Sequence, residues 1–376
     1  MSARRSRLVL LGLGHGHMQL LRDWATHKRT GVELTLVSPD EHFLYSACLS
    51  DWVSGRRDFA QDRVPVAPWL RASGAQWVRD RCIALDVNAR TLRLRDDPER
   101  TLRFDWLSIN TGASMGLDQL EQQIPGARGR VLPLRPLGQF MAYWEQALAT
   151  ARQRAMSVAV IGAGLGGAEL ALAVQQRLRQ VKARASVTLL GEPDWAPLAQ
   201  RAQAQLRRAL QRSGVQCLAQ RCTQVRDGEL LLDNGMRLQC DLPMVATGPQ
   251  APAWLAHSGL QLDAHGFVAV NAHQQSTSHA RVFALGDVAT RIDAALPKSA
   301  QSAWAAGAQH ADRLWAAIQG LNASAASTAT AHGQWVSTSD GRAIFAGRAW
   351  SLHGTWVAKR KRGREQAVLD ALRPPA

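Results

Sequence analysis

The sequence predicts an α/β protein with two parallel-sheet units and a small α+β segment at its C-terminal end. The chain has 376 residues, which is enough for two or three domains. A pattern of apolar strand, glycine-rich loop and helix occurs at residues 8–21 and again at residues 157–172. The segment after Gly333 shows strand-like runs around an Asp340-Gly341 turn, which is typical of a β-hairpin.

The first unit begins with an apolar strand from Leu8, followed by a glycine-rich turn and a helix. A second apolar run at residues 32–37 completes a βαβ unit, which is the building block of a parallel sheet. We expect residues 47–68, which are rich in tryptophan and arginine, to be irregular. Three further runs that end at Gly112 indicate short strands.

The second unit repeats this arrangement, with its second strand at residues 185–190. Residues 124–136 contain proline and glycine every few positions, which is typical of a connection between domains. Farther along, we expect one helix over residues 299–318. The small, polar stretch at residues 321–333 indicates a linker or loop.

The second glycine-rich loop predicts a dinucleotide site. Gly162, Gly164 and Gly167 match G-x-G-x-x-G directly after a strand and directly before a helix. The first glycine permits the tight turn, the second lets the backbone approach a pyrophosphate, and the third allows the helix to pack closely on the strand. A glycine turn without a ligand is the alternative, but the context on both sides favours a nucleotide.

The first loop departs from this pattern. Gly12 and Gly14 match, but His17 replaces the third glycine, so we expect the helix to lie slightly farther from the strand. Where an acidic residue usually binds the ribose hydroxyls, Ser38 is the expected substitute, with a weaker hydrogen bond. In the second unit Glu192 follows the second strand without an adjacent arginine for a 2′-phosphate, which favours NADH over NADPH.

Composition excludes several classes of protein. The 45 basic and 30 acidic residues give a net charge of +15, which suits phosphorylated cofactors, but no recognised nucleic-acid-binding pattern accompanies it, so we expect no nucleic acid partner. We expect neither a spanning helix nor a secretion signal. The five scattered cysteines fit a reducing compartment, so the cytoplasm is the expected location. We predict no metal site.

The paired loops resemble the two-dinucleotide-domain flavoproteins of the pyridine nucleotide-disulfide oxidoreductase superfamily, which includes the type II NADH dehydrogenases. Within it, the sequence is most similar to the branch found fused to, or beside, selenide, water dikinase. The matching stretches cover nearly the whole chain in the family's order: LVLLGLGHGHMQLL, VELTLVSPDEHFLYSACLSDWVSG, LSINTGAS, VAVIGAGLGGAELA, VATGP, RVFALGDVA and PKSAQSAWAAG.

The resemblance implies two Rossmann-like domains, with an FAD-binding domain interrupted by an NAD(P)H-binding domain. We therefore expect the following division of the chain: residues 1–118 and 249–320 for the FAD-binding domain, 119–150 for a connection, 151–248 for the NAD(P)H-binding domain, and 321–376 for the C-terminal segment.

The resemblance also implies which residues meet the flavin cofactor. The first loop would bind FAD, and Asp287 would hold the ribityl chain, because a carboxylate accepts hydrogen bonds from hydroxyl groups. The turn at residues 110–112 would lie near the flavin, although Asn110 replaces the usual alanine there. The turn at residues 246–248 would lie where the chain returns to the FAD-binding domain. Cys82 would meet adenine through its backbone. The remaining cofactor-binding residues are expected at Gly12, Gly14, His15, Thr111, Gly112, Gly248 and Gly286.

In such enzymes NADH reduces the flavin, and the flavin passes electrons to a second acceptor. Residues 18–25 lack the cysteine pair of the disulfide reductases, which excludes that subclass. Cys217 and Cys222 would lie about 16 Å apart in an extended run, so we expect them to be core thiols. Cys48 lies near where coenzyme A disulfide reductases and NADH peroxidases carry a single redox cysteine, and a packing role beside the flavin is its alternative.

Quinone is the favoured acceptor. Residues 297–307 resemble the helix that lines the quinone site of type II NADH dehydrogenases, with Gln301 matched and alanines at two usual glutamine positions. Lys298 could place a positive charge beside the reduced flavin or an anionic acceptor, or form a surface ion pair. The rival functions are a Cys48-dependent reductase of a persulfide, disulfide or peroxide, and a flavoprotein sensor without turnover.

The C-terminal segment could bring the protein to the inner face of a membrane. Trp350 and Trp356 precede a basic run at residues 359–364, a combination that suits an anionic lipid surface. A solvated helix end is the alternative. The sequence leaves open whether the segment after Gly333 forms a homodimer face or covers the flavin.

Overall fold

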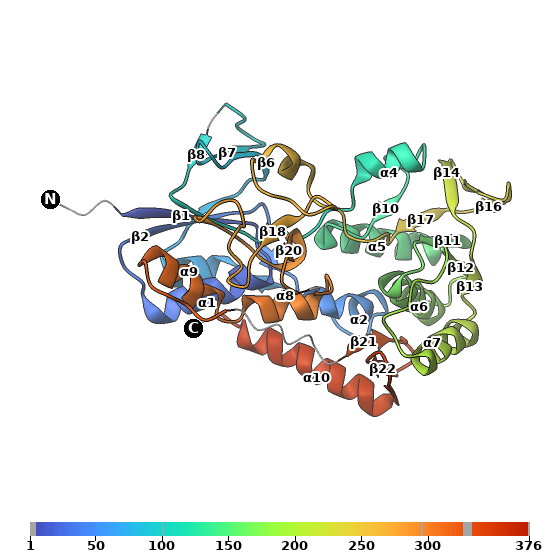
Figure 1. The fold of residues 1–376 in the computed structure, drawn as a ribbon. Coiled ribbons are helices and arrows are strands. Elements are labelled where there is room, and N and C mark those ends of the chain that lie inside the picture. The colour runs from blue at the N-terminus through green and yellow to red at the C-terminus, as the bar shows by residue number, and fades with distance from the viewer. Residues whose placement is uncertain (1–4, 100, 295, 326–332, 375–376) are drawn as a thin grey trace.

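The computed structural model describes residues 5–99, 101–294, 296–325 and 333–374. It confirms the predicted α/β class, because two five-stranded parallel sheets form the centres of two units (Figure 1). The first sheet has the order β19-β9-β1-β2-β5. Its strands are β19 (Val282–Ala284), β9 (Trp106–Ile109), β1 (Ser6–Leu11), β2 (Val32–Val37) and β5 (Gln76–Val78).

Both faces of this sheet are covered, which explains why the buried ends of β1 and β2 are mostly apolar. On one face lie α1 (His15–His27), α3 (Ala67–Ser73), α8 (Ala300–Gly307) and α9 (His310–Ile318). The other face packs against a small antiparallel sheet and a 3₁₀ helix, formed by β6 (Cys82–Asp86), β7 (Thr91–Leu94), β8 (Thr101–Arg103) and η2 (Ala253–His257).

Two expectations about the first unit are wrong. Residues 47–68 are not wholly irregular, since they contain the end of η1 (Ser46–Cys48), α2 (Leu49–Val53), β4 (Val64–Pro65) and the start of α3. The helix expected over residues 299–318 is broken into α8 and α9, because Gln309 has a left-handed backbone with φ of 59°. Its N-terminus is where the sequence predicted, and the Ser299 side chain caps it by accepting from the Ser302 amide.

The second unit repeats the plan of the first. Its parallel sheet has the order β10-β17-β11-β12-β13, formed by β10 (Leu132–Pro133), β17 (Leu242–Val245), β11 (Met156–Ile161), β12 (Ala185–Leu190) and β13 (Gln216–Leu218). Helices α5 (Leu137–Ala151), α6 (Leu165–Gln180) and α7 (Gln200–Ser213) cover one face. The other face packs against α4 (Leu117–Gln123) and a sheet of β14 (Cys222–Arg226), β15 (Glu229–Leu232) and β16 (Arg237–Gln239).

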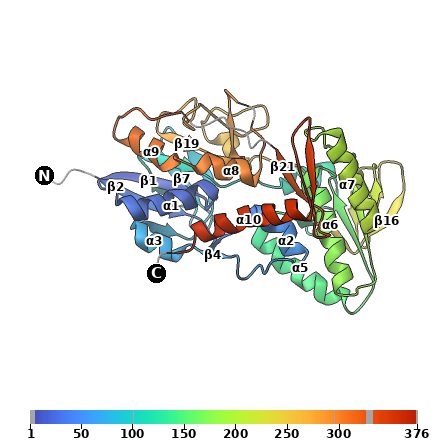
Figure 2. The ribbon, with the colours of Figure 1, turned by 90° about the horizontal axis from the view of Figure 1, so that it is seen from below.

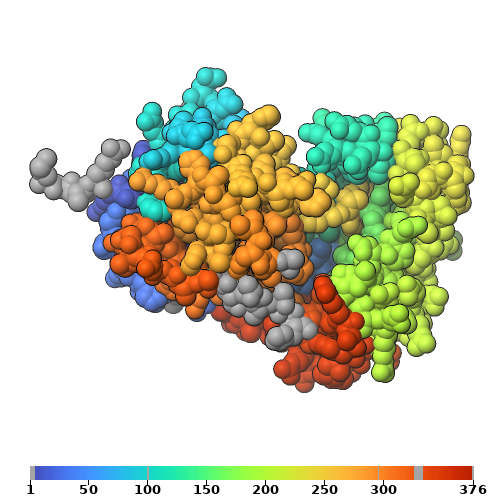
Figure 3. All heavy atoms as spheres, viewed as in Figure 1, coloured from blue at the N-terminus to red at the C-terminus, as the bar shows by residue number. Residues whose placement is uncertain are grey.

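The C-terminal segment contains the predicted hairpin and one long helix. Strands β21 (Gln334–Ser337), β22 (Ala343–Ala346) and β23 (Ser351–Gly354) form an antiparallel sheet, and α10 (Thr355–Ala371) follows. The sheet contacts α6 and α7, and α10 runs back beneath the first unit (Figure 2). Figure 3 shows the segment (red) against both lobes of the molecule. Within the described ranges, no helix is long and apolar enough to span a membrane.

Candidate functional site

A cavity of about 1030 Å³ lies where the strands of the first sheet end. Its walls come from the first glycine loop, the end of β2, the start of β6, the turn after β9 and the beginning of α5. This is the edge at which open parallel sheets bind their ligands. The volume lies at the upper end of the range for small-molecule and cofactor sites, so it suits a dinucleotide better than a small metabolite.

The glycines of the first loop are required by protein packing. Gly12 has φ of 92°, and a Cβ atom there would lie 2.5 Å from the Thr111 Cα atom. A Cβ atom on Gly14 would overlap the Asn110 side chain. The sequence predicts that Gly14 is small so that a pyrophosphate can approach it. In the structure its small size is needed for packing against Asn110. Both glycines nevertheless line the cavity.

His17 occupies the third glycine position as a hydrogen-bonded, fully buried side chain. Its Nδ1 atom lies 2.6 Å from the Gly12 carbonyl oxygen, and its Nε2 atom lies 2.8 Å from the Ser108 hydroxyl. The same hydroxyl lies 2.9 Å from His310 Nε2. Burial lowers the pKa of His17 to about 4. The close contact expected of the third glycine falls instead to Gly16, where a Cβ atom would collide with the Leu285 side chain.

Asn110 ties this loop to the strand beside it. Its Oδ1 atom accepts from the amides of Gly16 at 2.9 Å and His17 at 3.1 Å, and its Nδ2 atom donates to the Leu285 carbonyl at 2.7 Å. The side chain therefore satisfies two of the amides that the start of α1 leaves unpaired. The sequence indicated Asn110 only as a departure from the usual alanine and did not predict these bonds.

His15 lines the cavity from the first turn of α1. Its ring meets Phe43 and Tyr45 edge-on, with centroids 5.2 and 5.3 Å apart, and Tyr45 in turn meets Trp304 at 6.0 Å. Burial lowers the pKa of His15 to about 4, so the ring is neutral at pH 7. Its Nε2 atom is buried without a partner among the described residues. Such an atom is costly unless a bound group completes its surroundings, which fits a cavity built for a ligand.

The far end of the cavity carries groups suited to a nucleotide. Ser38 is buried there, and its hydroxyl accepts from the Asp40 amide at 3.2 Å, while Asp40 itself also lines the wall. Cys82 lies beside them, with its thiol 3.2 Å from the Ala84 carbonyl oxygen. The wall also carries four guanidinium groups that could bind a pyrophosphate, at Arg63, Arg81, Arg95 and Arg135. They stand among five carboxylates, at Asp40, Glu41, Asp80, Asp118 and Glu145, so the cavity as a whole is not positively charged.

Asp287 is nearly buried behind this cavity and forms an ion pair with Arg135 at 2.8 Å. The preceding Gly286 has φ of 72°, and a Cβ atom there would lie 2.8 Å from Asn110 Nδ2, so its small size serves packing against that amide. Arg135 comes from the connection before α5, and sequence reasoning missed it because nothing near residue 135 indicates a partner 152 positions away.

The two turns that resemble the family's pattern lie next to each other. Thr111 and Gly112 line the cavity after β9, and Gly248 follows β17 in an open position. Ser114 and Gln250, just beyond the turns, form a pair of backbone hydrogen bonds of 2.8 and 3.0 Å. The chain therefore leaves the first unit and returns to it at one place.

The second glycine loop has the predicted geometry. Gly162 has φ of 111°, and a Cβ atom on Gly167 would collide with the Gly162 carbonyl oxygen, which explains the close packing of α6. A Cβ atom on Gly164 would meet nothing within 4 Å. The indole of Trp195 donates to the Ala163 carbonyl at 2.9 Å and so fixes the loop after β12 against it. The Cβ direction of Gly164 is thus open, whereas that of Gly14 points at Asn110.

The three residues expected to take part in chemistry do not line the large cavity. Lys298 is not a surface ion pair, because its ammonium donates to the carbonyls of Asp287 and Ala289 at 3.0 and 2.9 Å and lies over the Phe267 ring. Gln301 lies in the first turn of α8. Cys48 has no exposed surface and does not line the cavity, and burial together with the negative charge of Glu365 raises the pKa of its thiol. A thiol in this state is a poor nucleophile.

Two expectations about other residues need correction. Cys217 is not a core thiol, because it lies exposed on the edge strand β13, whereas Cys222 is buried as expected. Lys361 does not belong to a basic surface. It is buried on α10, with its ammonium 2.5 Å from Glu365 Oε1 and 3.3 Å from the Ala47 carbonyl oxygen. Although burial opposes it, the charges of Glu365 and Glu169 raise the pKa of Lys361.

Glu169 joins the second loop to the C-terminal segment. It follows Gly167 in α6, and its Oε1 atom accepts from the Ser337 amide of β21 at 2.5 Å. Burial raises the pKa of Glu169 to about 7, and Lys361 acts against that rise. No residue described beyond position 320 lines the large cavity, so the described part of the segment packs against both units without covering this cavity.

Comparison with known proteins places this geometry among nucleotide-dependent oxidoreductases. The family model for pyridine nucleotide-disulphide oxidoreductases matches residues 6–307. Demethylphylloquinone reductase NdbB of Synechocystis is 25% identical over 336 residues, covering 85% of this chain and 81% of that protein. Alternative NAD(P)H-ubiquinone oxidoreductase C1 of Arabidopsis thaliana is 26% identical over 195 residues, which span 47% of this chain and 37% of that protein.

A solved structure shares nearly the whole fold. The structure of NDH2 from Plasmodium falciparum in complex with NADH matches with a TM-score of 0.80 at 13% identity and covers 98% of this chain and 96% of that chain. At this level of identity the likeness concerns the fold alone.

Proposed function

Because this chain belongs to the pyridine nucleotide-disulphide oxidoreductase family, we propose that it is a type II NADH dehydrogenase-like flavoenzyme that uses FAD to pass electrons from NADH to a quinone. One observation carries the proposal: each of the two parallel sheets has a glycine loop at the corresponding edge, where its first strand ends, and the first loop opens on a cavity of about 1030 Å³. FAD, when bound, would accept a hydride from the nicotinamide and pass the electrons on to the acceptor.

The residues of the first unit fit this cofactor. Asn110 occupies the amides of Gly16 and His17, so we assign the pyrophosphate to the preceding loop residues 13–15, the positive end of α1 and the arginines of the cavity wall. We assign the ribose hydroxyls to Asp40 together with Ser38. The Asp287 carboxylate, held in place by Arg135, is the acceptor that we assign to the ribityl chain.

The second loop is the site that we assign to NADH. The open space at Gly164 supports a closely approaching pyrophosphate, and Glu192 after β12 supports a ribose with free hydroxyls over one that carries a 2′-phosphate. Replacing Glu192 with glutamine is expected to reduce the preference for NADH over NADPH about tenfold. The ratio of kcat/KM for the two nucleotides measures this, and an unchanged ratio would remove Glu192 from the site.

The quinone acceptor is supported by the names of the relatives and by the surroundings of α8. Both relatives are named as reductases of quinones. Tyr45 meets both His15 and Trp304 edge-on, so a chain of aromatic rings links His15 in the cavity wall to α8. We propose that Gln301 and Lys298 belong to the approach of the acceptor along α8, with Lys298 acting through the backbone around Asp287.

The rival mechanism uses Cys48 as a redox thiol, and its burial weighs against that role. Replacing Cys48 with serine separates the two. The quinone enzyme retains its turnover with NADH and a soluble quinone, whereas a persulfide, disulfide or peroxide reductase loses its activity.

The first experiment is an anaerobic titration of the purified protein with NADH, followed by visible absorption. Bleaching of a bound flavin supports both nucleotide sites and leaves the acceptor to be identified by turnover with quinones. A bound flavin that stays oxidised supports the sensor without turnover. A protein that binds no flavin on addition of FAD would overturn the proposal.

We also propose contact with an anionic membrane surface through the C-terminal segment. Trp350, Leu352 and Trp356 are 41%, 43% and 54% exposed, and Lys359, Arg360 and Arg364 are exposed on the adjoining helix. Flotation with vesicles that contain anionic lipid is expected at low salt and is expected to be lost on replacing both tryptophans with alanine. Sedimentation of the free protein measures whether it also forms a homodimer.

A further inference from the structure

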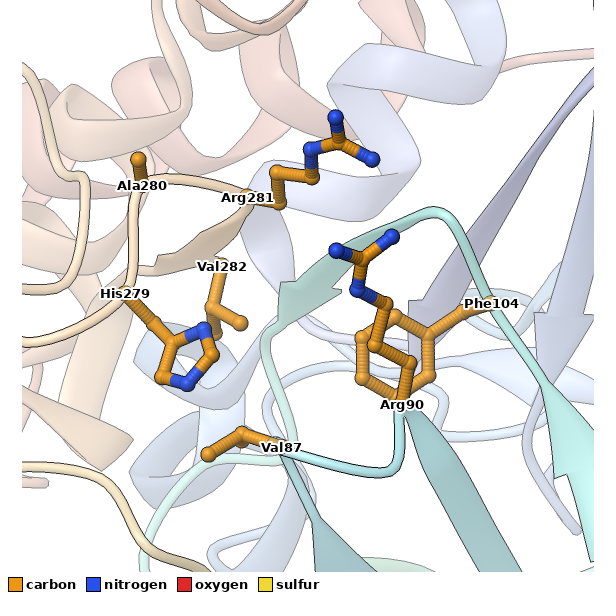
Figure 4. A pocket seen from close by; sticks show the side chains of 7 residues that line it. All are labelled: Val87, Arg90, Phe104, His279, Ala280, Arg281 and Val282. Carbon is orange, nitrogen blue, oxygen red and sulfur yellow. The ribbon is translucent and has the colours of Figure 1, made fainter.

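A second hollow, of about 210 Å³, lies at the opposite edge of the first sheet from the cofactor cavity. It opens between the turn that joins β6 to β7 and the segment that leads into β19 (Figure 4). None of its residues lines the large cavity. It is formed by Val87, Arg90, Phe104, His279, Ala280, Arg281 and Val282.

The floor of the hollow is apolar. Val87, Phe104 and Val282 are 0%, 1% and 0% exposed, and all three belong to the core on this face of the sheet. The side chain of Arg90 stands next to the Phe104 ring in Figure 4, which leaves its guanidinium group at the rim. Side chains buried to this degree offer almost no accessible surface, so a ligand in the hollow would meet mainly the groups of its rim.

The rim is cationic and lacks an acidic partner. The guanidinium groups of Arg90 and Arg281 form no ion pair among the described residues, and Arg281 lies 5.8 Å from the centroid of the Trp106 ring. His279 stands across the hollow, with Nε2 3.3 Å from Asn88 Oδ1. Two like charges beside one hollow repel each other, and an anion placed between them would relieve that repulsion.

The backbone at Arg90 adds a separate observation. It has φ of 54°, a conformation that glycine or asparagine adopts more easily at such a turn. A Gly or Asn here would make the same turn with less strain, so the turn itself does not require an arginine. The arginine at this position places its side chain beside the hollow.

We propose that this hollow is a binding site for a small anion, with a carboxylate or phosphate group held by Arg90 and Arg281. Arginine binds both kinds of oxyanion through paired N–H groups. The volume corresponds to roughly seven water molecules, which is far too small for a dinucleotide. The site is therefore separate from both proposed nucleotide sites and does not depend on the proposed function.

Isothermal titration of the FAD-loaded protein at low ionic strength tests the proposal. The probes are benzoate and phenyl phosphate, with benzyl alcohol as a neutral molecule of similar shape. Binding of at least one anion is expected, benzyl alcohol is expected not to bind, and R90Q and R281Q are each expected to weaken the anion about tenfold. R201Q is the matched control, because Arg201 is an exposed arginine at the start of α7 in the other unit.

Three results would each overturn the proposal. Neither anion binds, benzyl alcohol binds as tightly as the anions, or R90Q and R281Q leave the binding of the anion unchanged. Because both arginines are exposed, the variants are expected to fold, and their melting temperatures without ligand check this. Flavin content and reduction by NADH are recorded in the same samples, so a failure of the anion site is distinguishable from a failure of the proposed function.

Discussion

The two glycine loops share one spacing but are packed by different groups. In the second loop the contacts are between backbone atoms: Gly162 meets the chain at Ala246, and Gly167 meets the Gly162 carbonyl oxygen. In the first loop Gly12 likewise meets backbone at Thr111, but polar side chains fill the space at the second and third positions, with Asn110 against Gly14 and His17 bonded to Gly12.

This difference shows what a glycine motif requires. The residue at the third position lies against the carbonyl oxygen of the first glycine. A glycine there avoids this oxygen because it has no side chain, and a histidine there satisfies it by donating a hydrogen bond from the imidazole. His17 is therefore a structural alternative to glycine, and its presence does not indicate a degenerate nucleotide site. The cost is a network of buried polar groups that must all remain paired.

The largest effect is expected where only backbone is available. Replacing Gly167 with alanine forces α6 away from β11, because a backbone carbonyl cannot move aside as a side chain does. We expect a loss of about 3 kcal/mol or more in the free energy of unfolding and loss of flavin reduction by NADH, while bound flavin remains. The control is Gly166→Ala, where a Cβ atom meets nothing within 4 Å and little change is expected. Equal stability of the two variants would contradict the packing argument.

Asn110→Ala makes the first unit resemble the second, in which the corresponding residue is Ala246. We expect a loss of about 3 kcal/mol, because two amides and one carbonyl lose their buried partner. Denaturant unfolding measures it. Asn234→Ala, which removes an exposed asparagine that accepts one local amide, is the control and is expected to cost less than about 1 kcal/mol. A loss no greater than this control would mean that the first loop does not depend on Asn110.

His17→Gly restores the complete motif and is nevertheless expected to destabilise the protein by 2 to 3 kcal/mol. The change leaves a cavity under the loop and removes the side-chain partner of the Gly12 carbonyl and one of the two partners of the Ser108 hydroxyl. Unfolding in denaturant and the flavin content of the purified variant are the measurements. A more stable variant would show that the histidine is an imperfect substitute for glycine and would break the comparison drawn above.

Acid is expected to weaken the first unit specifically. His15 and His17 have a pKa of about 4 in the folded protein against an ordinary 6.5, so the unfolded state binds more protons between these values. Stability is therefore complete above pH 6.5 and is lost as the pH falls toward 4, by about 2 kcal/mol for each histidine at pH 5. Comparing unfolding at pH 7 and pH 5 tests this, and His17→Gly is expected to show a smaller pH dependence than the unaltered chain.

The sequence was sufficient to predict the two sheets, because the signals for them are local. Each glycine loop and its flanking strand and helix lie within about 15 residues, and the alternation around Asp340 predicts the hairpin in the same way. Local signals also explain the errors. Residues 47–68 lack a clear period, so the short helix α2 was missed, and no residue type marks the break at Gln309.

The side-chain contacts of the site were mostly outside the reach of sequence reasoning. His17 was recognised as a departure, but its partners Ser108 and His310 come from β9 and α9, which lie far along the chain. Lys361 looked like one charge of a basic run, and only its position against Glu365 and Ala47 shows that it is buried. Pairings of this kind depend on how distant elements meet, which the composition of either segment does not encode.

The paired hydrogen bonds between Ser114 and Gln250 have a consequence for the evolution of such proteins. Because the outgoing and returning chains are neighbours, the second unit is attached like an insertion whose two ends meet. A unit attached in this way can be exchanged, duplicated or diverged while the first unit keeps its sheet and its termini. The same junction gives protein engineers a place at which a domain with another nucleotide preference can be grafted.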